Sequence, residues 1–295
     1  MPTVESLQCP DVTIGIDLGG TGTRLVALDS SGVIRHELSR ATPRAGTHDA
    51  VGALADLVTE VAANTRPTAI GIGASGPVDA GGIIRNPDTL AAYSGIALAA
   101  ALTDRLGLPC VIDNDAVTAA IGEHRLGAGS GSQALLTVTL GTGIGVAMLV
   151  AGRPVRSADG THPEGGHIAV AGPAAPCYCW LDPCWEQLAS RTALDRLTQG
   201  RAAEVAEHAR GKDPAAQELF RTYGSRVGAG LATLVTIYRP DRIVLGGGAA
   251  QYLDIFVDSM RQGMDRPQNY SWAGPIIAAE LGDIAGAVGG AVLAR

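Results

Sequence analysis

The chain has 295 residues, of which 46% are hydrophobic and 17% charged, and this length and composition favour two lobes with apolar cores. A net charge of -7 argues against nucleic acid as a partner, because non-specific binding to phosphates needs clustered Lys and Arg. The first ten residues lack the pattern of a signal peptide, and glycines interrupt the apolar run over residues 134–152. We therefore expect a soluble, cytoplasmic protein that does not enter a membrane.

A β-hairpin with a glycine-rich turn is predicted over residues 12–31, where apolar strand residues flank the turn on both sides. The turn contains Asp17, Gly19, Gly20 and Thr21. Glycine lets backbone N–H groups approach a phosphate because no Cβ stands in the way, and threonine adds a hydroxyl. The same pattern also fits an ordinary tight turn, so the hairpin alone is a weak sign of nucleotide binding.

A related hairpin is predicted near the middle of the chain, over residues 135–152. Its turn contains Gly141, Thr142 and Gly143. Two hairpins with similar glycine-rich turns indicate that one structural unit is duplicated in the chain. If each copy opens its own lobe, the two turns could hold one polyphosphate from both sides of a cleft. The sequence has no P-loop motif, which favours this two-lobed arrangement.

Helices and strands alternate between the two hairpins, as is typical of an α/β fold. The expected elements are helices over residues 50–63, 97–106 and 116–125 and strands over 69–72 and 109–112. Asp113, Asn114 and Asp115 stand where the last of these strands ends and the last helix begins. Polar residues at such a junction commonly carry the chemistry of an α/β fold. The alternative is that they only cap the helix.

Helices dominate the chain beyond residue 184. They are expected over residues 184–197, 201–209, 214–238 and 283–295. A strand over 242–245 runs into Gly246 and Gly247, and backbone amides at such a turn can pack against the base and ribose of a nucleotide. Alternatively, these glycines serve only close packing of the next helix.

Three of the five cysteines lie in one short stretch, at Cys177, Cys179 and Cys184, and His167 precedes them. Three thiolates and an imidazole form a tetrahedral set of ligands that suits zinc. Four protein ligands leave no position for a reacting water, so we expect a structural zinc ion. The alternative is three cysteines that fall together in a loop by chance.

Seven short motifs follow one another along nearly the whole chain. They are D-L-G-G-T at 17–21, G-P-V-D at 76–79, N-D-A at 114–116, L-G-T-G-I-G at 140–145, E-x-G-H at 164–167, C-x-C-x4-C-x-E at 177–186 and L-G-G-G at 245–248. In this order they resemble the ROK sugar kinases. The resemblance implies the α/β fold of actin-like ATPases, with two ribonuclease-H-like lobes, a cleft that holds ATP and sugar, and commonly a homodimer.

The same resemblance implies how the chain divides and what it does. The small N-terminal lobe would comprise residues 1–115 and 283–295, and the larger lobe 116–282 would carry the zinc loop and the dimer helices. The implied activity is ATP-dependent phosphorylation of a hexose or N-acetylhexosamine, most like a glucokinase. Fructokinase, N-acetylmannosamine kinase, a polyphosphate-dependent kinase and a sugar-sensing regulator without a DNA-binding domain are the alternatives.

Site residues follow from the resemblance position by position. Asp115 looks like the catalytic base that accepts the proton of the sugar hydroxyl. The implied sugar-binding residues are Gly76, Asn114, Glu164, His167 and Glu186. ATP and its Mg²⁺ would bind at Asp17, Gly19, Gly20, Thr21, Gly141, Thr142, Gly143, Gly246 and Gly247. The implied zinc ligands are His167, Cys177, Cys179 and Cys184.

The cysteine loop departs from the family pattern C-x-C-G-x-x-G-C-x-E at two positions. Trp180 and Pro183 stand where the family has glycines. Proline does not adopt the positive φ that glycine allows. We therefore expect the loop to follow a different path, with an effect on its affinity for zinc.

Overall fold

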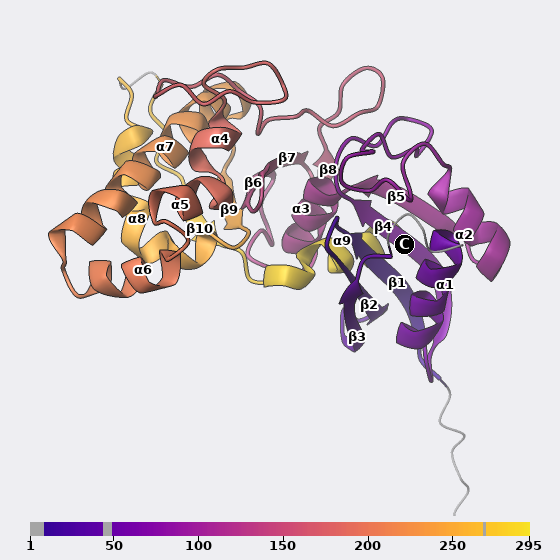
Figure 1. Cartoon of the computed structure of the whole chain (residues 1–295). Coiled ribbons are helices and arrows are strands. Elements are labelled where there is room, and N and C mark those ends of the chain that lie inside the picture. Colours follow the sequence, from indigo (N-terminus) through magenta and orange to yellow (C-terminus); the bar gives the residue numbers. More distant parts are fainter. Residues whose placement is uncertain (1–8, 44–48, 268–269) are drawn as a thin grey trace, which may run out of the picture. The chain divides into compact units, whose positions relative to one another are not determined.

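The computed structural model describes residues 9–43, 49–267 and 270–295 (Figure 1). These residues form two compact units. The first comprises the described residues up to Leu126, together with Arg156–His162 and Asp283–Arg295. The second comprises Gly127–Val155 and the described residues of Pro163–Gly282. In neither unit do the described residues include a helix with the length and apolar character that crossing a membrane requires.

The first unit is built on a mixed sheet of five strands in the order β3-β2-β1-β4-β5. The strands are β1 (Asp11–Leu18), β2 (Gly22–Asp29), β3 (Ile34–Ala41), β4 (Arg66–Ala74) and β5 (Cys110–Asn114). Neighbours among β1, β2 and β3 are antiparallel, whereas β1, β4 and β5 run in the same direction. Their carboxyl ends therefore meet at one edge, where Leu18 pairs with Ala74 and Ala74 with Asn114.

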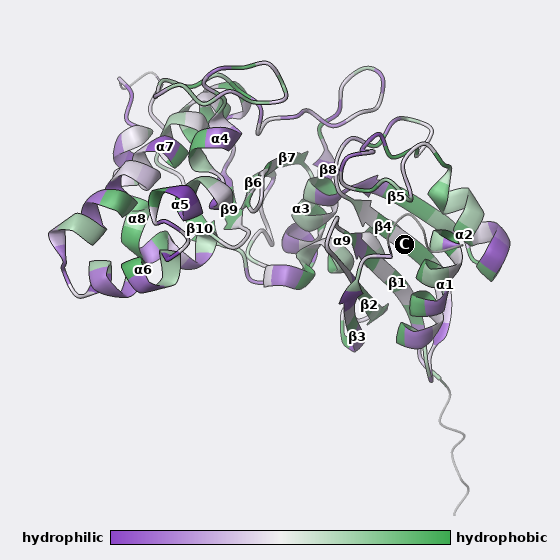
Figure 2. Ribbon diagram, in the orientation of Figure 1, coloured by the Kyte–Doolittle hydropathy of each residue, from purple (hydrophilic) through white to green (hydrophobic). Residues whose placement is uncertain are grey.

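One face of this sheet is covered by α1 (Ala50–Val61) and α2 (Leu98–Leu106). Alternate residues of β1 and β4, such as Ile14 and Ile70, are fully buried in the core that these helices complete. Figure 2 shows the hydrophobic colour along β1 and β4 and hydrophilic stretches on α1 and α2. The period of two in the strands thus directs their apolar side chains to one face.

The other face is covered by α9 (Ala285–Leu293), which packs almost backbone to backbone against the sheet. A Cβ on Gly15 of β1 would lie 1.7 Å from the carbonyl oxygen of Ala287, and one on Gly71 of β4 would lie 1.8 Å from that of Gly290. These strand positions therefore need glycine, because any side chain would push the helix away.

Helix α3 (Asp115–Leu126) packs against α9 in the same way, since a Cβ on Gly289 would lie 1.6 Å from the carbonyl oxygen of Thr118. This contact places α3 in the first unit, and the compact units divide after Leu126. The expected lobes of residues 1–115 with 283–295 and of 116–282 stay a prediction.

The second unit has a sheet in the order β10-β9-β6-β7-β8. Its strands are β6 (Ala134–Leu140), β7 (Ile144–Val150), β8 (Arg153–Pro154), β9 (Arg242–Gly246) and β10 (Ile276–Ala278). The helices are α4 (Trp185–Ala189), α5 (Arg191–Leu197), α6 (Ala202–Arg210), α7 (Pro214–Tyr238) and α8 (Leu253–Gly263), with the short turn η1 (Ala250–Tyr252). The short turn η3 (Gly282–Ile284) spans the boundary at which the chain returns to the first unit. Strand β9 runs parallel to β6 and β10, and β6 and β7 form an antiparallel hairpin.

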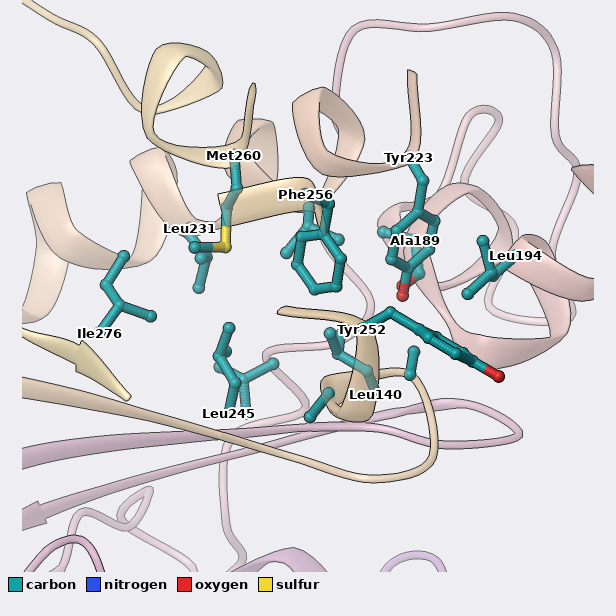
Figure 3. Close-up of a cluster of buried hydrophobic side chains, with 14 of the residues drawn as sticks. Leu140, Ala189, Leu194, Tyr223, Leu231, Leu245, Tyr252, Phe256, Met260 and Ile276 are labelled. Carbon is teal, nitrogen blue, oxygen red and sulfur yellow. The ribbon is translucent and has the colours of Figure 1, made fainter. Parts of the chain in front are cut away.

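Figure 3 shows the core of this unit, where Leu140 and Leu245 from the strands meet the side chains of α7 and α8. Tyr223 of α7 and Phe256 of α8 are fully buried, and their rings meet edge to face at 5.2 Å between centroids. The core fixes the strand ends from which the glycine turns of this unit project.

Both predicted hairpins are confirmed, as β1–β2 and β6–β7. The single helix expected over 184–197 was wrong, because α4 and α5 are separated at Ser190. Ser190 has an extended backbone, and its hydroxyl accepts a hydrogen bond from the backbone N–H of Ala193 at 3.2 Å. Such a serine ends one helix and caps the next.

Candidate functional site

The turn between β1 and β2 holds the first set of predicted nucleotide-binding residues. The backbone N–H of Gly19 donates to the carbonyl of Gly22 at 3.1 Å, which closes the turn around the exposed Thr21. A Cβ on Gly20 would lie 2.3 Å from Cγ2 of Thr89. A side chain at position 20 would therefore require Thr89 to shift.

Asp17, at the end of β1, faces the N-terminal end of α9, where a Cβ on Gly286 would lie 2.9 Å from the Asp17 Cγ. Burial, which is the largest cause, and the nearby carboxylate of Asp115 together raise the pKa of this carboxyl from 3.8 to about 7. Arg24, with Nη1 at 4.0 Å from the Asp17 Oδ2, opposes the rise. Two carboxyl groups close together at a strand end favour the binding of a cation.

The junction of β5 and α3 brings together three predicted residues, Gly76, Asn114 and Asp115. The buried Asn114 donates from Nδ2 to the carbonyl of Gly76 at 3.0 Å, and its Oδ1 accepts from the backbone N–H of Ala116 at 2.8 Å. The Asp115 Oδ1 accepts from the same N–H at 2.8 Å. Asn114 therefore caps the helix as well as fixing Gly76, and its role as a sugar ligand stays a prediction.

An ion pair behind this junction gave no signal in the sequence. The buried Asp113 binds Arg156, which lies 43 residues later in the chain, with 3.3 Å from Nη1 to Oδ1 and a second contact from Nη2 to Oδ2. The Asp113 Oδ1 also accepts from the backbone N–H of Asn114 at 2.8 Å. Arg156 thus anchors the strand end that carries Asn114 and Asp115.

The remaining glycine turns lie next to each other in the second unit. The Gly141 N–H donates to the carbonyl of Gly143 at 3.0 Å, and the carbonyl of Gly141 accepts from the Arg191 N–H at 2.8 Å. Gly247 has a φ of +79°, and a Cβ there would lie 2.6 Å from the carbonyl of Leu140. Only glycine fits this approach, which brings the turn after β9 against the turn after β6.

His167 and Glu186 form the second cluster of predicted sugar ligands. The Glu186 carboxylate is buried, and its Oε2 accepts from the backbone N–H of Ile144 at 3.0 Å. The His167 Nε2 lies 3.8 Å from this oxygen. Glu164 is exposed, and its carbonyl accepts from the backbone N–H of His167 at 3.0 Å. The structure therefore brings all three residues close together in the second unit.

The four predicted zinc ligands converge, with their ligand atoms all within 4.8 Å of one another. The His167 Nδ1 lies 3.7 Å from the Cys177 Sγ and 3.5 Å from the Cys184 Sγ, and the Cys179 and Cys184 sulfurs are 3.7 Å apart. One imidazole and three thiols in this arrangement fit a tetrahedral zinc ion.

The two unusual residues of the cysteine loop do not prevent this convergence. Trp180 adopts a φ of +69°, the left-handed conformation that a glycine of the family pattern would take easily. Pro183 follows a cis peptide bond. The loop thus delivers all its ligands with Trp180 and Pro183 in place, and their effect on zinc affinity stays a prediction.

Tyr178, between two of the cysteines, is a site residue that the sequence did not reveal. Its hydroxyl lies 2.8 Å from the His167 Nε2, and the two rings meet edge to face with centroids 4.9 Å apart. It occupies a variable position of the C-x-C motif, so no pattern points to it. Partial desolvation of this hydroxyl beside His167 and the neighbouring charges of Glu186, Cys177 and Glu164 raise its pKa, so it stays protonated at neutral pH.

Comparison with known proteins decides the family, since the ROK family model matches residues 13–295. The chain belongs to the ROK family. Among ROK proteins, a glucokinase of Streptomyces coelicolor is 33% identical, over 96% of this chain and 98% of the relative.

Solved structures of other ROK proteins match the whole fold. A ROK family glucokinase from Streptomyces griseus, in complex with glucose and AMPPNP, has a TM-score of 0.83 at 32% identity and covers 96% of this chain and 99% of its own. A ROK hexokinase from Thermus thermophilus has a TM-score of 0.80 at 31% identity, over 96% and 97%. The resemblance drawn from the seven motifs and the predicted α/β fold of actin-like ATPases are confirmed.

Proposed function

We propose that this ROK protein is a sugar kinase that transfers the γ-phosphoryl group of ATP to a hydroxyl of a hexose or N-acetylhexosamine, with glucose as the first candidate. One observation carries the proposal. The glucokinase whose structure contains glucose and AMPPNP, an analogue of ATP, is 32% identical and aligns over nearly all of both chains. Relatedness of this extent supports a shared reaction class.

Asp115 is the proposed catalytic base. It stands at the first position of α3, directly after β5, and the hydrogen bond from the Ala116 N–H orients its carboxylate. It would accept the proton of the attacking hydroxyl while the oxygen of that hydroxyl bonds to the γ-phosphorus and ADP leaves. Positioning matters more than basicity in this reaction, because its transition state is loose. The ion pair of Asp113 and Arg156 supports that positioning.

The proposed sugar ligands are Gly76, Asn114, Glu164, His167 and Glu186. The His167 Nε2 and the Glu186 Oε2, 3.8 Å apart, can bind neighbouring hydroxyls of one ring, one as a donor and one as an acceptor. The buried position of Glu186 strengthens its hydrogen bonds to a hydroxyl. This donor and acceptor pair supports a substrate with vicinal hydroxyls.

The proposed nucleotide ligands are Asp17, Gly19, Gly20, Thr21, Gly141, Thr142, Gly143, Gly246 and Gly247. Glycines at these turns leave backbone N–H groups open to phosphate oxygens. Mg²⁺ would accompany ATP, and Asp17 is the residue we assign to it, because its raised pKa is relieved by a bound cation. ATP is the proposed donor, rather than polyphosphate, because the Streptomyces griseus relative is in complex with AMPPNP.

Zinc is the metal we assign to His167, Cys177, Cys179 and Cys184. When bound, it supplies structural cross-linking of the loop. The His167 ring turns Nδ1 toward the cysteines and Nε2 away from them, and Nε2, which contacts the Tyr178 hydroxyl in the structure, is the nitrogen proposed to bind the sugar. A homodimer and a cytoplasmic location are further parts of the proposal, which rest on the family resemblance.

The test is release of ADP, measured by a coupled assay with ATP and Mg²⁺ over glucose, fructose, mannose, N-acetylmannosamine and N-acetylglucosamine. We expect turnover, with the highest kcat/KM for glucose. Replacement of ATP by polyphosphate should lower the rate of glucose phosphorylation. The absence of turnover with every sugar would overturn the proposal. Sugar binding without turnover would instead identify a sugar-sensing regulator.

A further inference from the structure

We propose that Tyr178 sets the sugar affinity of this protein, because its hydroxyl occupies the His167 nitrogen that a sugar hydroxyl takes over on binding. This inference rests on the proposed function, in which His167 is a sugar ligand. It adds a residue of this chain's own cysteine loop to the determinants of substrate binding.

The two ring nitrogens of His167 face different groups. Nδ1 faces the sulfurs of Cys177 and Cys184 at 3.7 and 3.5 Å. Nε2 faces the hydroxyl of Tyr178 at 2.8 Å, the distance of a well-formed hydrogen bond. The Tyr178 ring stands at 74° to the imidazole, and the two rings are in edge-to-face contact.

The roles of donor and acceptor follow from this arrangement. With a metal cation on the cysteine cluster, Nδ1 gives its lone pair to the cation and the proton of the neutral ring resides on Nε2. Nε2 then donates, and the Tyr178 oxygen accepts. A sugar hydroxyl oxygen would accept the same hydrogen bond. The Nε2–H of His167 donates one good hydrogen bond at a time. The Tyr178 oxygen and the sugar oxygen therefore compete for it and cannot both accept.

Displacement of Tyr178 has a small structural cost. The residue is 77% exposed, so its departure removes little packing from the core of the second unit. Among the described residues, the Tyr178 side chain makes its hydrogen bond and its ring contact with His167, and it lies near the charges of Glu186 and Glu164. The sugar therefore competes mainly against one hydrogen bond, whose net value corresponds to a change of roughly two- to tenfold in affinity.

The experiment compares wild type with Tyr178→Phe, which keeps the ring and removes the acceptor. We expect the KM for glucose and the Kd for glucose from calorimetry both to fall two- to tenfold, while kcat and zinc content stay unchanged. The matched control is Trp180→Phe, an exposed aromatic of the same loop, which should change neither constant. A third variant, Tyr178→Ala, should lower the KM as Phe does, because it too lacks the hydroxyl.

Each outcome separates this inference from the proposed function. An unchanged or raised KM and Kd in Tyr178→Phe, with an active wild type, would overturn the role of Tyr178 and leave the kinase assignment intact. An equal fall in the Trp180→Phe control would also overturn it, because the effect would then belong to the loop in general. A wild type that neither binds nor phosphorylates a sugar would overturn the proposed function and this inference with it.

Discussion

Replacement of Asp17 by Asn is expected to stabilise the protein at alkaline pH. Burial, together with the charge of Asp115, raises the pKa of Asp17 from 3.8 to about 7. A raised pKa means that the fold favours the neutral carboxyl. That contribution to stability is fully present below pH 3.8 and is lost as the pH rises through 7. Asparagine has no charge at any pH, so its advantage over aspartate grows across this range.

The size of the stabilisation by Asp17→Asn follows from the shift in the pKa of Asp17. A rise of the pKa from 3.8 to about 7 corresponds to about 4 kcal/mol when the carboxyl is fully ionised. The Asp17 side chain is 21% exposed, and solvent therefore screens part of the free-energy cost of its charge. We expect about 2 kcal/mol in favour of Asn at pH 8.5 and a difference near zero at pH 4, which corresponds to about 5 °C in the unfolding midpoint.

The assay is thermal unfolding of wild type and Asp17→Asn at pH 4, 6 and 8.5, without nucleotide or Mg²⁺. The control is Asp11→Asn, because Arg66 lowers the pKa of Asp11 and this variant should gain no stability at pH 8.5. A difference between wild type and Asp17→Asn that is the same at every pH would contradict this prediction, since the buried charge would then contribute nothing to the stability difference.

Two further predictions concern packing and metal. Gly15→Ala places a Cβ against the carbonyl of Ala287 and should destabilise the protein by about 3 kcal/mol, whereas Gly22→Ala, with its nearest atom at 3.8 Å, should change stability by less than about 0.5 kcal/mol in denaturant unfolding. Equal losses of stability in Gly15→Ala and Gly22→Ala would contradict the close contact between β1 and α9. Metal analysis should find one zinc per chain in wild type and in Cys9→Ser but none in Cys179→Ser, and zinc retained by Cys179→Ser would remove the assigned site.

Local patterns carried most of what could be predicted. The two hairpins depend on glycines within a few residues of the turns, and the cysteine cluster needed only the spacing of its ligands. Asn114 and Asp115 were predicted as site residues because a strand end and a helix start coincide there, and their roles stay predictions. In each case the signal and the structure that it indicates lie in the same short segment.

Contacts between distant segments had no such signal. Arg156 binds Asp113 from 43 residues away, and nothing near either residue marks the other as its partner. The need for glycine at position 15 arises from α9, at the far end of the chain. The contact of Tyr178 with His167 depends on how the cysteine loop folds, and the sequence did not indicate it. Tertiary packing decides these features, and a single sequence does not record which segments meet.

The central claim is most directly tested by the rate of ADP release with glucose, ATP and Mg²⁺ in wild type and in Asp115→Asn. A carboxylate that accepts the proton of the attacking hydroxyl accounts for roughly 10²- to 10⁴-fold in rate. We expect an active wild type and a kcat lowered by at least about a hundredfold in Asp115→Asn, with bound glucose still detected by calorimetry. An Asp115→Asn protein with full activity would contradict it.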